Sequence, residues 1–483
     1  MSAVQLRTEY PYARAPRLAA STGAYLIGVM PPELIDKLGI KLTLLKRDPY
    51  YFLPTLDNRY LLFGSQTSLE DQFKAFFSEA DWHAHLRLQE EIGAIRDDIA
   101  PALLSSPLSL EETADKYIRT SLRDVFIELC RGSVGAYLDR FDFHSDLVKA
   151  MYATTDGFTG CFGGWDTPGT GMNFLVHNLC RLPNSDGTWM ICQGGMGAVT
   201  QALKEEAIKS GVDIRTDSEV VEIVTNQSVC RGVVLKDQSE IKADTVVCNA
   251  DPFKMRALVG EEKLPSDYNE KLNGYARLGG SSFKLNMAAA RLPVFKCLPQ
   301  DLGQYRTTTH LLPTEDNVLA VIDRSYKQAS DGLLPDRPLI EWYFHTTVDE
   351  TIRDDQGNHS MALFVQWAPT RPKNMTWEEA EPVFVKRILS VLDEYAPGTS
   401  ELIIDTLPLS PMGIEKRFGI TGGHIFHVDH RFGFGERLPY RTPIDGLYAA
   451  GAACHPGGGV MGAPGYNAAE AVLKDRETAM SVR

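Results

Sequence analysis

The feature that most constrains the fold is a glycine-rich segment near the carboxyl end of the chain. It reads Gly446-Leu-Tyr-Ala-Ala-Gly-Ala-Ala-Cys-His-Pro-Gly-Gly-Gly-Val-Met-Gly462, and five of its last twelve positions are glycine. The pattern predicts a strand over 446–450, a tight turn, and a helix from about Tyr466. At such a turn, backbone N–H groups and a helix N-terminus can approach an anion or a carbonyl oxygen closely. The alternative is a surface loop without a ligand. We disfavour it because glycine loses more conformational entropy on folding than other residues, and a loop without a function would not require so many.

The spacing of Gly457, Gly459 and Gly462 matches the GxGxxG motif of a dinucleotide-binding fold. That fold needs a second strand, whose acidic residue about 20 positions further on binds the ribose. Only 21 residues follow Gly462, so this segment cannot complete such a unit. We therefore interpret it as a strand, a turn and a helix that meet a ligand, and not as a nucleotide-binding fingerprint.

The rest of the chain mixes helical patterns with short strands, which predicts an α/β fold combined with α+β regions. Residues 66–150 have apolar residues at helical spacing, and a helix over 198–210 ends at Gly211, a residue favoured after helix ends. A further helix is predicted over 378–395. Runs of β-branched residues between polar turns predict strands at 212–215, 219–224, 231–236, 240–243, 245–248, 282–287, 320–322 and 362–367.

Charge and cysteine usage exclude several classes of protein. The net charge of −14 argues against nucleic acids and anionic membranes as partners, because both attract clustered Lys and Arg. No segment approaches the roughly 20 apolar residues that span a bilayer. The 8 cysteines are scattered without a CxxC pair, which indicates buried thiols of a reducing compartment. We expect an intracellular soluble protein, in the mitochondrial matrix of a eukaryote or in the cytoplasm of a bacterium.

A metal site is a second hypothesis, because His424, His427, Asp429 and His430 crowd one segment. Histidines three residues apart share a face only on a helix. Gly422-Gly423 and the β-forming residues that follow predict a turn and a strand, in which His424 and His427 point to opposite faces. We therefore expect no metal. A serine hydrolase is disfavoured because the chain lacks a GxSxG motif.

Several motifs occur in the order in which one enzyme family carries them. They are Thr167-Pro-Gly-Thr-Gly171, Gly194-Gly-Met-Gly197, Gly211-Val-Asp-Ile-Arg-Thr216, Val220-Val-Glu-Ile223, Val246-Val-Cys-Asn-Ala-Asp-Pro252, Tyr395-Ala-Pro-Gly398, Phe418-Gly-Ile-Thr-Gly-Gly-His-Ile-Phe-His427 and His455-Pro-Gly-Gly-Gly-Val-Met-Gly462. From about Arg14 to Lys474, the chain resembles the phytoene desaturase and carotene isomerase-like branch of FAD-dependent amine-oxidase-type enzymes. Within that branch it resembles especially the pyridine nucleotide-disulfide oxidoreductase domain-containing protein 2 group.

The resemblance implies a glutathione reductase-like FAD domain built from residues 1–40, 190–260 and 420–483. Residues 41–189 and 261–419 would form a substrate domain of mixed sheet and helices. The implied cofactor is FAD, with the backbone of Val220 at the adenine and the N–H of Val460 or Met461 at the flavin C2 carbonyl. A helix N-terminus there would favour the negative charge of reduced flavin. The turn along the pyrophosphate and ribityl chain would comprise Gly451, Ala452, Gly458, Gly459 and Gly462.

The family begins with a strand–GxGxxG–helix unit that binds the ADP half of FAD. This sequence has no GxGxxG before residue 457, so we expect an FAD domain without that unit and a weak retention of FAD. The reaction implied is hydride transfer between a mostly apolar organic substrate and flavin, as in desaturases, dehydrogenases and isomerases.

The alternative is a flavin-free form that acts as a non-catalytic interaction or regulatory protein, and a protein partner or homo-oligomer is left open. The sequence identifies no catalytic acid or base. His455 is the only titratable side chain in the flavin-facing turn, and we interpret it as an imidazole that stabilises the turn.

Overall fold

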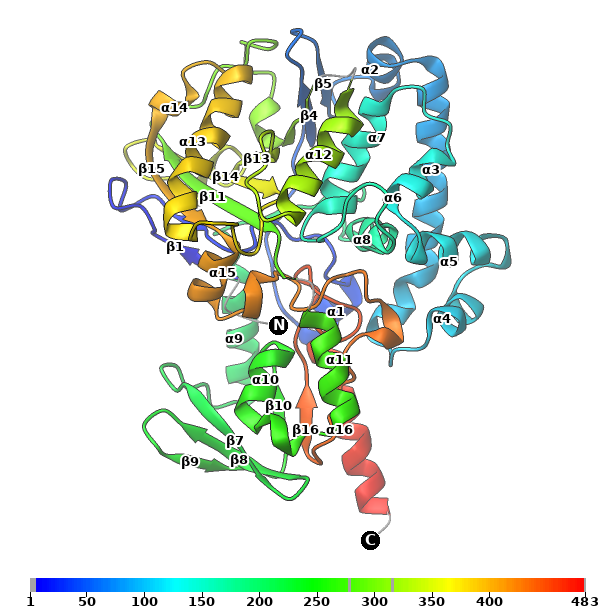
Figure 1. The fold of residues 1–483 in the computed structure, drawn as a ribbon, viewed down its shortest axis with the longest axis vertical. Helices are drawn as coiled ribbons and strands as arrows, with labels where there is room; N and C mark the ends of the chain where they lie inside the picture. The colour runs from blue at the N-terminus through cyan, green and yellow to red at the C-terminus, as the bar shows by residue number, and fades with distance from the viewer. Residues whose placement is uncertain (1–5, 277–278, 314–316, 482–483) are drawn as a thin grey trace.

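The computed structural model describes residues 6–276, 279–313 and 317–481. In Figure 1, an upper region combines a large sheet with a layer of helices. A lower region of smaller sheets and helices lies beneath it and extends to the C-terminal helix α16 (Ala463–Ser481).

A seven-stranded sheet with the order β15-β11-β14-β13-β12-β4-β5 is the centre of the upper region. Its neighbouring strands are antiparallel except β12 and β4, which run parallel. Successive side chains of a strand point to opposite faces. Phe52 and Leu62 thus share a core with helix α13 (Trp377–Tyr395), whereas Leu53 packs with the helical layer. The strands are β4 (Tyr51–Pro54), β5 (Tyr60–Phe63), β11 (Ser282–Ala289), β12 (Thr308–Leu311), β13 (Leu339–Phe344), β14 (His359–Gln366) and β15 (Ile403–Leu409).

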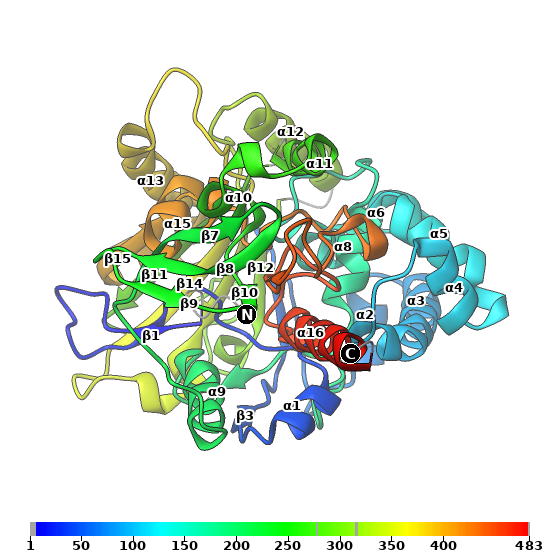
Figure 2. The ribbon, with the colours of Figure 1, turned by 90° about the horizontal axis from the view of Figure 1, so that it is seen from below.

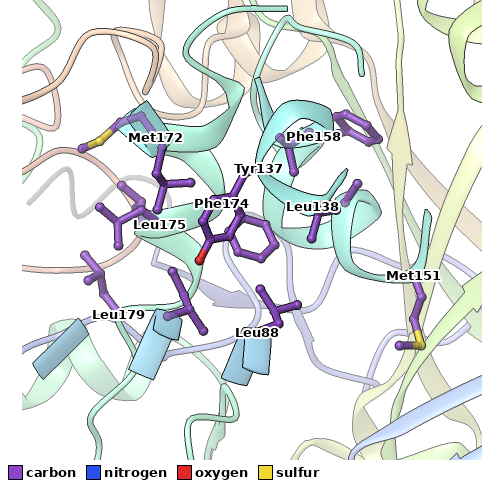
Figure 3. Packing of buried hydrophobic residues seen from close by; sticks show 14 of the residues in the cluster. Leu88, Tyr137, Leu138, Met151, Phe158, Met172, Phe174, Leu175 and Leu179 are labelled. Atoms are coloured by element: carbon purple, nitrogen blue, oxygen red, sulfur yellow. The ribbon is translucent and has the colours of Figure 1, made fainter. Parts of the chain in front are cut away.

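The helical layer forms because its helices are apolar on the side that faces the sheet. Leu88, Ile92, Ile95 and Ile99 of α3 recur at helical spacing, and all are buried. Figure 3 shows Leu88 close to Phe174 within this core. The layer consists of α2 (Leu69–Phe76), α3 (Glu79–Ile99), α4 (Leu110–Tyr117), α5 (Arg123–Arg131), α6 (Val134–Asp139), α7 (Asp146–Tyr152), the π-helix η4 (Ala153–Phe158), α8 (Thr170–His177) and α12 (Val318–Ser330).

Two small sheets organise the lower region (Figures 1 and 2). Strands β10 (Val246–Cys248) and β16 (Leu447–Ala449) pair in parallel, so both end at the same edge. The antiparallel meander is formed by β7 (Val220–Asn226), β8 (Val229–Leu235) and β9 (Glu240–Lys242). The helices of this region are α9 (Gly197–Lys209), α10 (Pro252–Val259), α11 (Ser266–Ala276) and α16.

Short elements connect these parts. Thr8 links the amino-terminal segment to the turn before α9, because its Oγ1 donates to the Gly194 carbonyl (2.8 Å) and accepts from the Gly197 N–H (3.0 Å). The short strands and helices are β1 (Thr8–Glu9), β2 (Ala20–Ser21), β3 (Leu44–Leu45), β6 (Ile191–Cys192), α1 (Pro32–Leu38), α14 (Thr399–Leu402) and α15 (Pro411–Phe418). The 3-10 turns are η2 (Ala100–Leu104), η3 (Thr120–Leu122), η5 (Glu261–Lys263), η6 (Gln304–Arg306), η8 (His345–Thr347), η9 (Glu350–Ile352), η10 (Thr421–Gly423) and η11 (Phe434–Glu436).

The arrangement confirms the predicted α/β class and most of the predicted elements, including the helices over 66–150, 198–210 and 378–395. Two predicted strands are wrong. Residues 320–322 lie inside α12, where Val318, Val321 and Ile322 are buried at helical spacing. Residues 212–215 are exposed and belong to none of the sheets formed by the described residues.

All 8 cysteines are free thiols, and 7 of them are buried. No helix within the described ranges is both long and apolar enough to span a membrane.

Candidate active site

The glycine-rich turn begins at the edge where β10 and β16 both end. Ligands of sheets with parallel strands bind at such carboxyl ends. Strand β10 leads into Asn249 and then Asp251. Asp251 Oδ1 accepts from the N–H groups of Phe253 and Lys254 at the start of α10 (2.9 and 3.0 Å). Asp251 Oδ2 accepts from the N–H and the Oγ1 of Thr421 (both 3.0 Å). Asp251 therefore holds α10 and the segment before His424 around this edge.

The turn has the backbone conformation that its glycines permit. Gly457, Gly459 and Gly462 have φ of +130°, +105° and +70°, and Val460 has φ of +64°. A β-branched residue at positive φ is strained, and such strain persists where surrounding structure fixes the backbone. His455 provides part of that restraint, because its Nε2 donates to the Ala102 carbonyl (2.9 Å) and burial lowers the pKa of His455 to about 4. The imidazole is neutral and stabilises the turn, as predicted.

Buried polar atoms without partners surround the turn. Within the described part of the chain, Asn249 Oδ1, both ring nitrogens of His427 and Nε2 of His430 make no hydrogen bond. His427 Nδ1 is 3.3 Å from the position that a Cβ on Gly451 would take, so this imidazole lies directly against the end of β16. Each unsatisfied buried group costs about 1–3 kcal/mol. These unpaired atoms lie beside a glycine-rich turn, and they are suited to hydrogen bonds with the phosphates and hydroxyls of FAD.

The structure brings seven of the eight predicted cofactor residues together in this turn. Gly451 and Ala452 follow β16, Gly462 precedes α16, and Met461 is buried in the large core. A Cβ on Gly458 would lie 2.6 Å from Phe426 Cδ1, so the turn and Phe426 are in direct contact. Val220 lies apart as the first residue of β7 and is half-buried. The individual contacts predicted between these residues and FAD stay predictions.

A cavity of about 590 Å³ adjoins the turn. Gly459 and Val460 form part of its wall, beside Ile425, Phe426 and Trp189. The exposed residues Lys46, Ser65 and Asp186 line its mouth, and Lys46 pairs there with Asp186. Other apolar residues that line the cavity are Leu26, Phe63, Leu69, Ile92, Met151 and Phe364.

The cavity is also lined by a set of hydrogen-bonded polar residues that we call the polar floor. His310 bonds to Thr155 Oγ1 through Nε2 (2.6 Å) and to Tyr51 through Nδ1 (3.0 Å), and burial lowers the pKa of His310 to about 3. Glu341 accepts from Thr159 Oγ1 (2.5 Å) and Tyr343 Oη (2.6 Å), and burial raises the pKa of Glu341. The polar floor comprises Tyr51, Thr155, Asp156, Thr159, His310, Glu341 and Tyr343.

Asp156 reaches the cavity from the π-helix η4, a local distortion often found at functional sites. Its Oδ2 accepts from Asn178 Nδ2 (3.1 Å). Burial raises the pKa of Asp156 to about 7, a shift that the Asn178 bond opposes and the Glu341 charge increases. The buried Arg47 lies in the same wall, where it donates to the Trp189 carbonyl (2.9 Å) and to Thr308 Oγ1 (2.6 Å). The cavity therefore combines apolar walls with groups able to move a proton.

The histidine segment does not contain the predicted strand, because residues 424–430 form turns and bends. Its imidazoles have separate surroundings: His424 pairs with Asp429 (3.4 Å), His430 bonds to Asn173 Oδ1 (2.9 Å), and His427 lies on Gly451. Burial would raise the pKa of Asp429, but His424 and Arg431 hold it well below its usual range. Among the described residues, no group of three or more His, Cys, Asp or Glu could hold a metal ion. The expectation of no metal stays a prediction.

The polar floor is not predicted from the sequence, because its residues come from segments without a motif. Two of them were detectable in principle. Glu341 interrupts the apolar strand Leu-Ile-Glu-Trp-Tyr-Phe, and His310 lies in the buried strand β12. A charged residue inside an apolar strand must find a buried partner or a cavity.

Comparisons with known proteins identify the class of protein to which this fold belongs. Residues 32–321 match the family described as flavin containing amine oxidoreductase. The chain is 29% identical over 507 residues to pyridine nucleotide-disulfide oxidoreductase domain-containing protein 2 of Rattus norvegicus, covering 95% of this chain and 86% of the relative. Identity to hydroxyneurosporene desaturase of Rubrivivax gelatinosus is 26% over 334 residues, covering 66% of this chain and 56% of the relative.

Among solved structures, an oxidoreductase from Methanosarcina mazei has a similar fold, with a TM-score of 0.56 and 14% identity over 97% of this chain and 90% of the other. The chain belongs to the flavin containing amine oxidoreductase family. It is thus an oxidoreductase whose cofactor is FAD. The alternative of a flavin-free interaction protein receives no support from these comparisons.

Proposed function

We propose that the chain transfers a hydride between FAD and a mostly apolar organic substrate, in a desaturase, dehydrogenase or isomerase reaction. One observation carries the proposal: Gly459 and Val460 belong both to the predicted cofactor turn and to the wall of the 590 Å³ cavity. A cofactor on the turn and a substrate in the cavity would share this surface. The apolar lining around Phe426 supports the substrate class, as does the relative named hydroxyneurosporene desaturase.

FAD would supply the acceptor for the electron pair, and the protein would supply orientation, a low-polarity cavity and local charge. Gly451, Ala452, Gly458, Gly459 and Gly462 would hold the cofactor along the turn. The N–H of Val460 or Met461 would face the flavin, and the backbone of Val220 would face the adenine. The α16 N-terminus adjoins the turn, and its dipole favours negative charge there.

We also propose the division into a discontinuous FAD domain, 1–40, 190–260 and 420–483, and a substrate domain, 41–189 and 261–419. The first five residues of the FAD domain and its last two, 482–483, lie outside the described part of the chain. Two residues of the substrate domain, 277–278, and three more, 314–316, lie outside it as well.

The reaction is tested by anaerobic bleaching of the flavin absorbance in FAD-loaded protein. One panel contains ten-carbon alkenes, dienes and alcohols, and a matched panel contains small hydrophilic amines and polyols. We expect members of the apolar panel to bleach the flavin and the hydrophilic panel to leave it oxidised. Bleaching by the hydrophilic panel alone, or by neither panel, contradicts the proposed substrate class.

A further inference from the structure

One carboxylate of the polar floor has an oxygen that the fold does not use. Both oxygens of Glu341 accept hydrogen bonds, and both nitrogens of His310 are bonded. Asp156 accepts a side-chain hydrogen bond at Oδ2 only, from Asn178, and no described residue bonds to its Oδ1. Because Asp156 lines the cavity, this oxygen is available to a bound molecule.

Two chains of contacts connect Asp156 with the glycine-rich turn. Asn178 follows His177, whose ring stacks on Trp189 with centroids 5.7 Å apart, and Trp189 lies 4.0 Å from the position of a Cβ on Gly459. On the other side, η4 contains Asp156 and ends at Phe158. Gly160, two residues further on, packs against Phe426, the residue that contacts Gly458. Asp156 and the turn therefore border one space from two sides.

The charges around this space favour a neutral ligand group over a cation. Arg47 is buried in the wall with its guanidinium 6.0 Å from the Tyr343 ring centroid. Lys284 lies behind Tyr25, 4.6 Å from that ring centroid, and donates to the Ser21 carbonyl (2.6 Å). Burial lowers the pKa of Lys284 well below its usual value, because this wall solvates a positive charge poorly. An ammonium group of a ligand would be buried in the same wall, beside the Arg47 guanidinium. A hydroxyl can donate to Asp156 Oδ1 without changing the charge.

We propose that the cavity binds a secondary alcohol with an apolar body, and that Asp156 accepts the hydroxyl proton as the alcohol is oxidised to a ketone. This inference rests on the proposed function and narrows its substrate class.

The carbinol C–H bond breaks, and its hydrogen leaves with the electron pair as a hydride to FAD, the cofactor of the family. The O–H bond breaks, the C=O double bond forms, and the proton passes to the Asp156 carboxylate. It then leaves through the mouth at Lys46 and Asp186. A carboxylate is a suitable base for a hydroxyl that becomes acidic during oxidation, but a poor base for an unactivated C–H bond.

The ionisation of Asp156 fits this role near neutral pH. Burial raises the pKa of Asp156 to about 7, and the titratable groups that face it are Glu341 from β13, Tyr51 from β4, Tyr152 from α7 and His177 from α8. Burial raises the pKa of both tyrosines and lowers that of His177, so these three groups stay neutral. The proton-accepting form of Asp156 therefore predominates above about pH 7.

The test compares wild type with Asp156→Asn, which keeps the shape and an acceptor for Asn178 but removes the base. The control is Asp139→Asn, an exposed acid that pairs with Lys149 (2.9 Å) outside the cavity. Binding of 2-decanol, decane and 2-aminodecane to FAD-loaded protein is measured by headspace partitioning. We expect Asp156→Asn to weaken 2-decanol binding about tenfold and to leave decane binding unchanged, and Asp139→Asn to change neither. An equal loss for decane and 2-decanol, no loss for either, or a largest loss for 2-aminodecane overturns the proposal.

The same proteins are then mixed anaerobically with 2-decanol at pH 8. We expect bleaching of the wild-type flavin and a rate about 100-fold lower in Asp156→Asn, the usual loss on removing a general base. Equal rates in the two proteins overturn the assignment of Asp156. Bleaching of wild type by alkenes or dienes but not by 2-decanol overturns the alcohol substrate while the proposed function stands. Failure of the whole apolar panel contradicts the proposed function itself.

Discussion

Replacement of Gly459 by valine is expected to lower the affinity for FAD about 100-fold, or about 2.7 kcal/mol of binding free energy. Gly459 has φ of +105°, a conformation closed to β-branched residues. An added Cβ would lie 3.0 Å from Val29 Cγ2, and the branched side chain would occupy the surface proposed for the cofactor. Titration of the protein with FAD, followed by the flavin fluorescence, measures the change.

The matched control is Gly211→Val. Gly211 follows α9 with φ of +81°, and an added Cβ there would meet nothing within 4 Å. Both variants carry backbone strain, but only one of them alters the turn. An FAD affinity that is unchanged in Gly459→Val, or equally reduced in both variants, would mean that the cofactor does not bind along this turn.

The second large effect is on stability, where Asp156→Asn is expected to raise the free energy of unfolding at pH 8. Burial raises the folded-state pKa of Asp156 from 3.8 to about 7. A group with a raised folded-state pKa favours folding below its unfolded-state pKa, and this contribution is lost as pH rises through the folded-state value. The shift corresponds to about 4 kcal/mol, which we reduce to about 3 kcal/mol because the carboxylate is partly exposed to the cavity.

The amide cannot ionise, so the advantage of the variant depends on pH. We expect it to be about 1 kcal/mol smaller at pH 6 than at pH 8, because wild-type Asp156 is mostly protonated at pH 6. Urea unfolding at the two pH values measures the difference, with Asp139→Asn as the exposed control. A constant difference between Asp156→Asn and wild type would show that Asp156 does not titrate in this range.

The sequence predicted the glycine-rich turn and its neighbouring elements because local chemistry determines them. Gly457, Gly459 and Gly462 occupy backbone conformations that few other residues adopt, and such positions are visible in sequence. The helices α3 and α13 were equally visible, because each has an apolar face with helical spacing.

The polar floor could not be predicted in the same way, because it depends on contacts between distant segments. Thr155 and His310 are 155 positions apart, and Thr159 and Glu341 are 182 positions apart. The strand predicted after Gly423 failed for a related reason. Asp429 accepts from the distant Phe162 N–H (3.0 Å) and His430 bonds to the distant Asn173, and these tertiary bonds hold the segment in turns and bends despite its β-forming residues.

The central claim, that FAD and substrate share the surface formed by Gly459 and Val460, is tested most directly through the fluorescence of Trp189. This ring lies 4.0 Å from the position of a Cβ on Gly459, so FAD on the turn would quench it by contact. We predict that FAD quenches the wild-type protein more than Trp189→Phe, by an amount equal to the emission of Trp189, and that 2-decanol changes the spectrum of the bound flavin. Equal quenching in the two proteins, together with a flavin spectrum unaffected by any member of the apolar panel, would contradict the account.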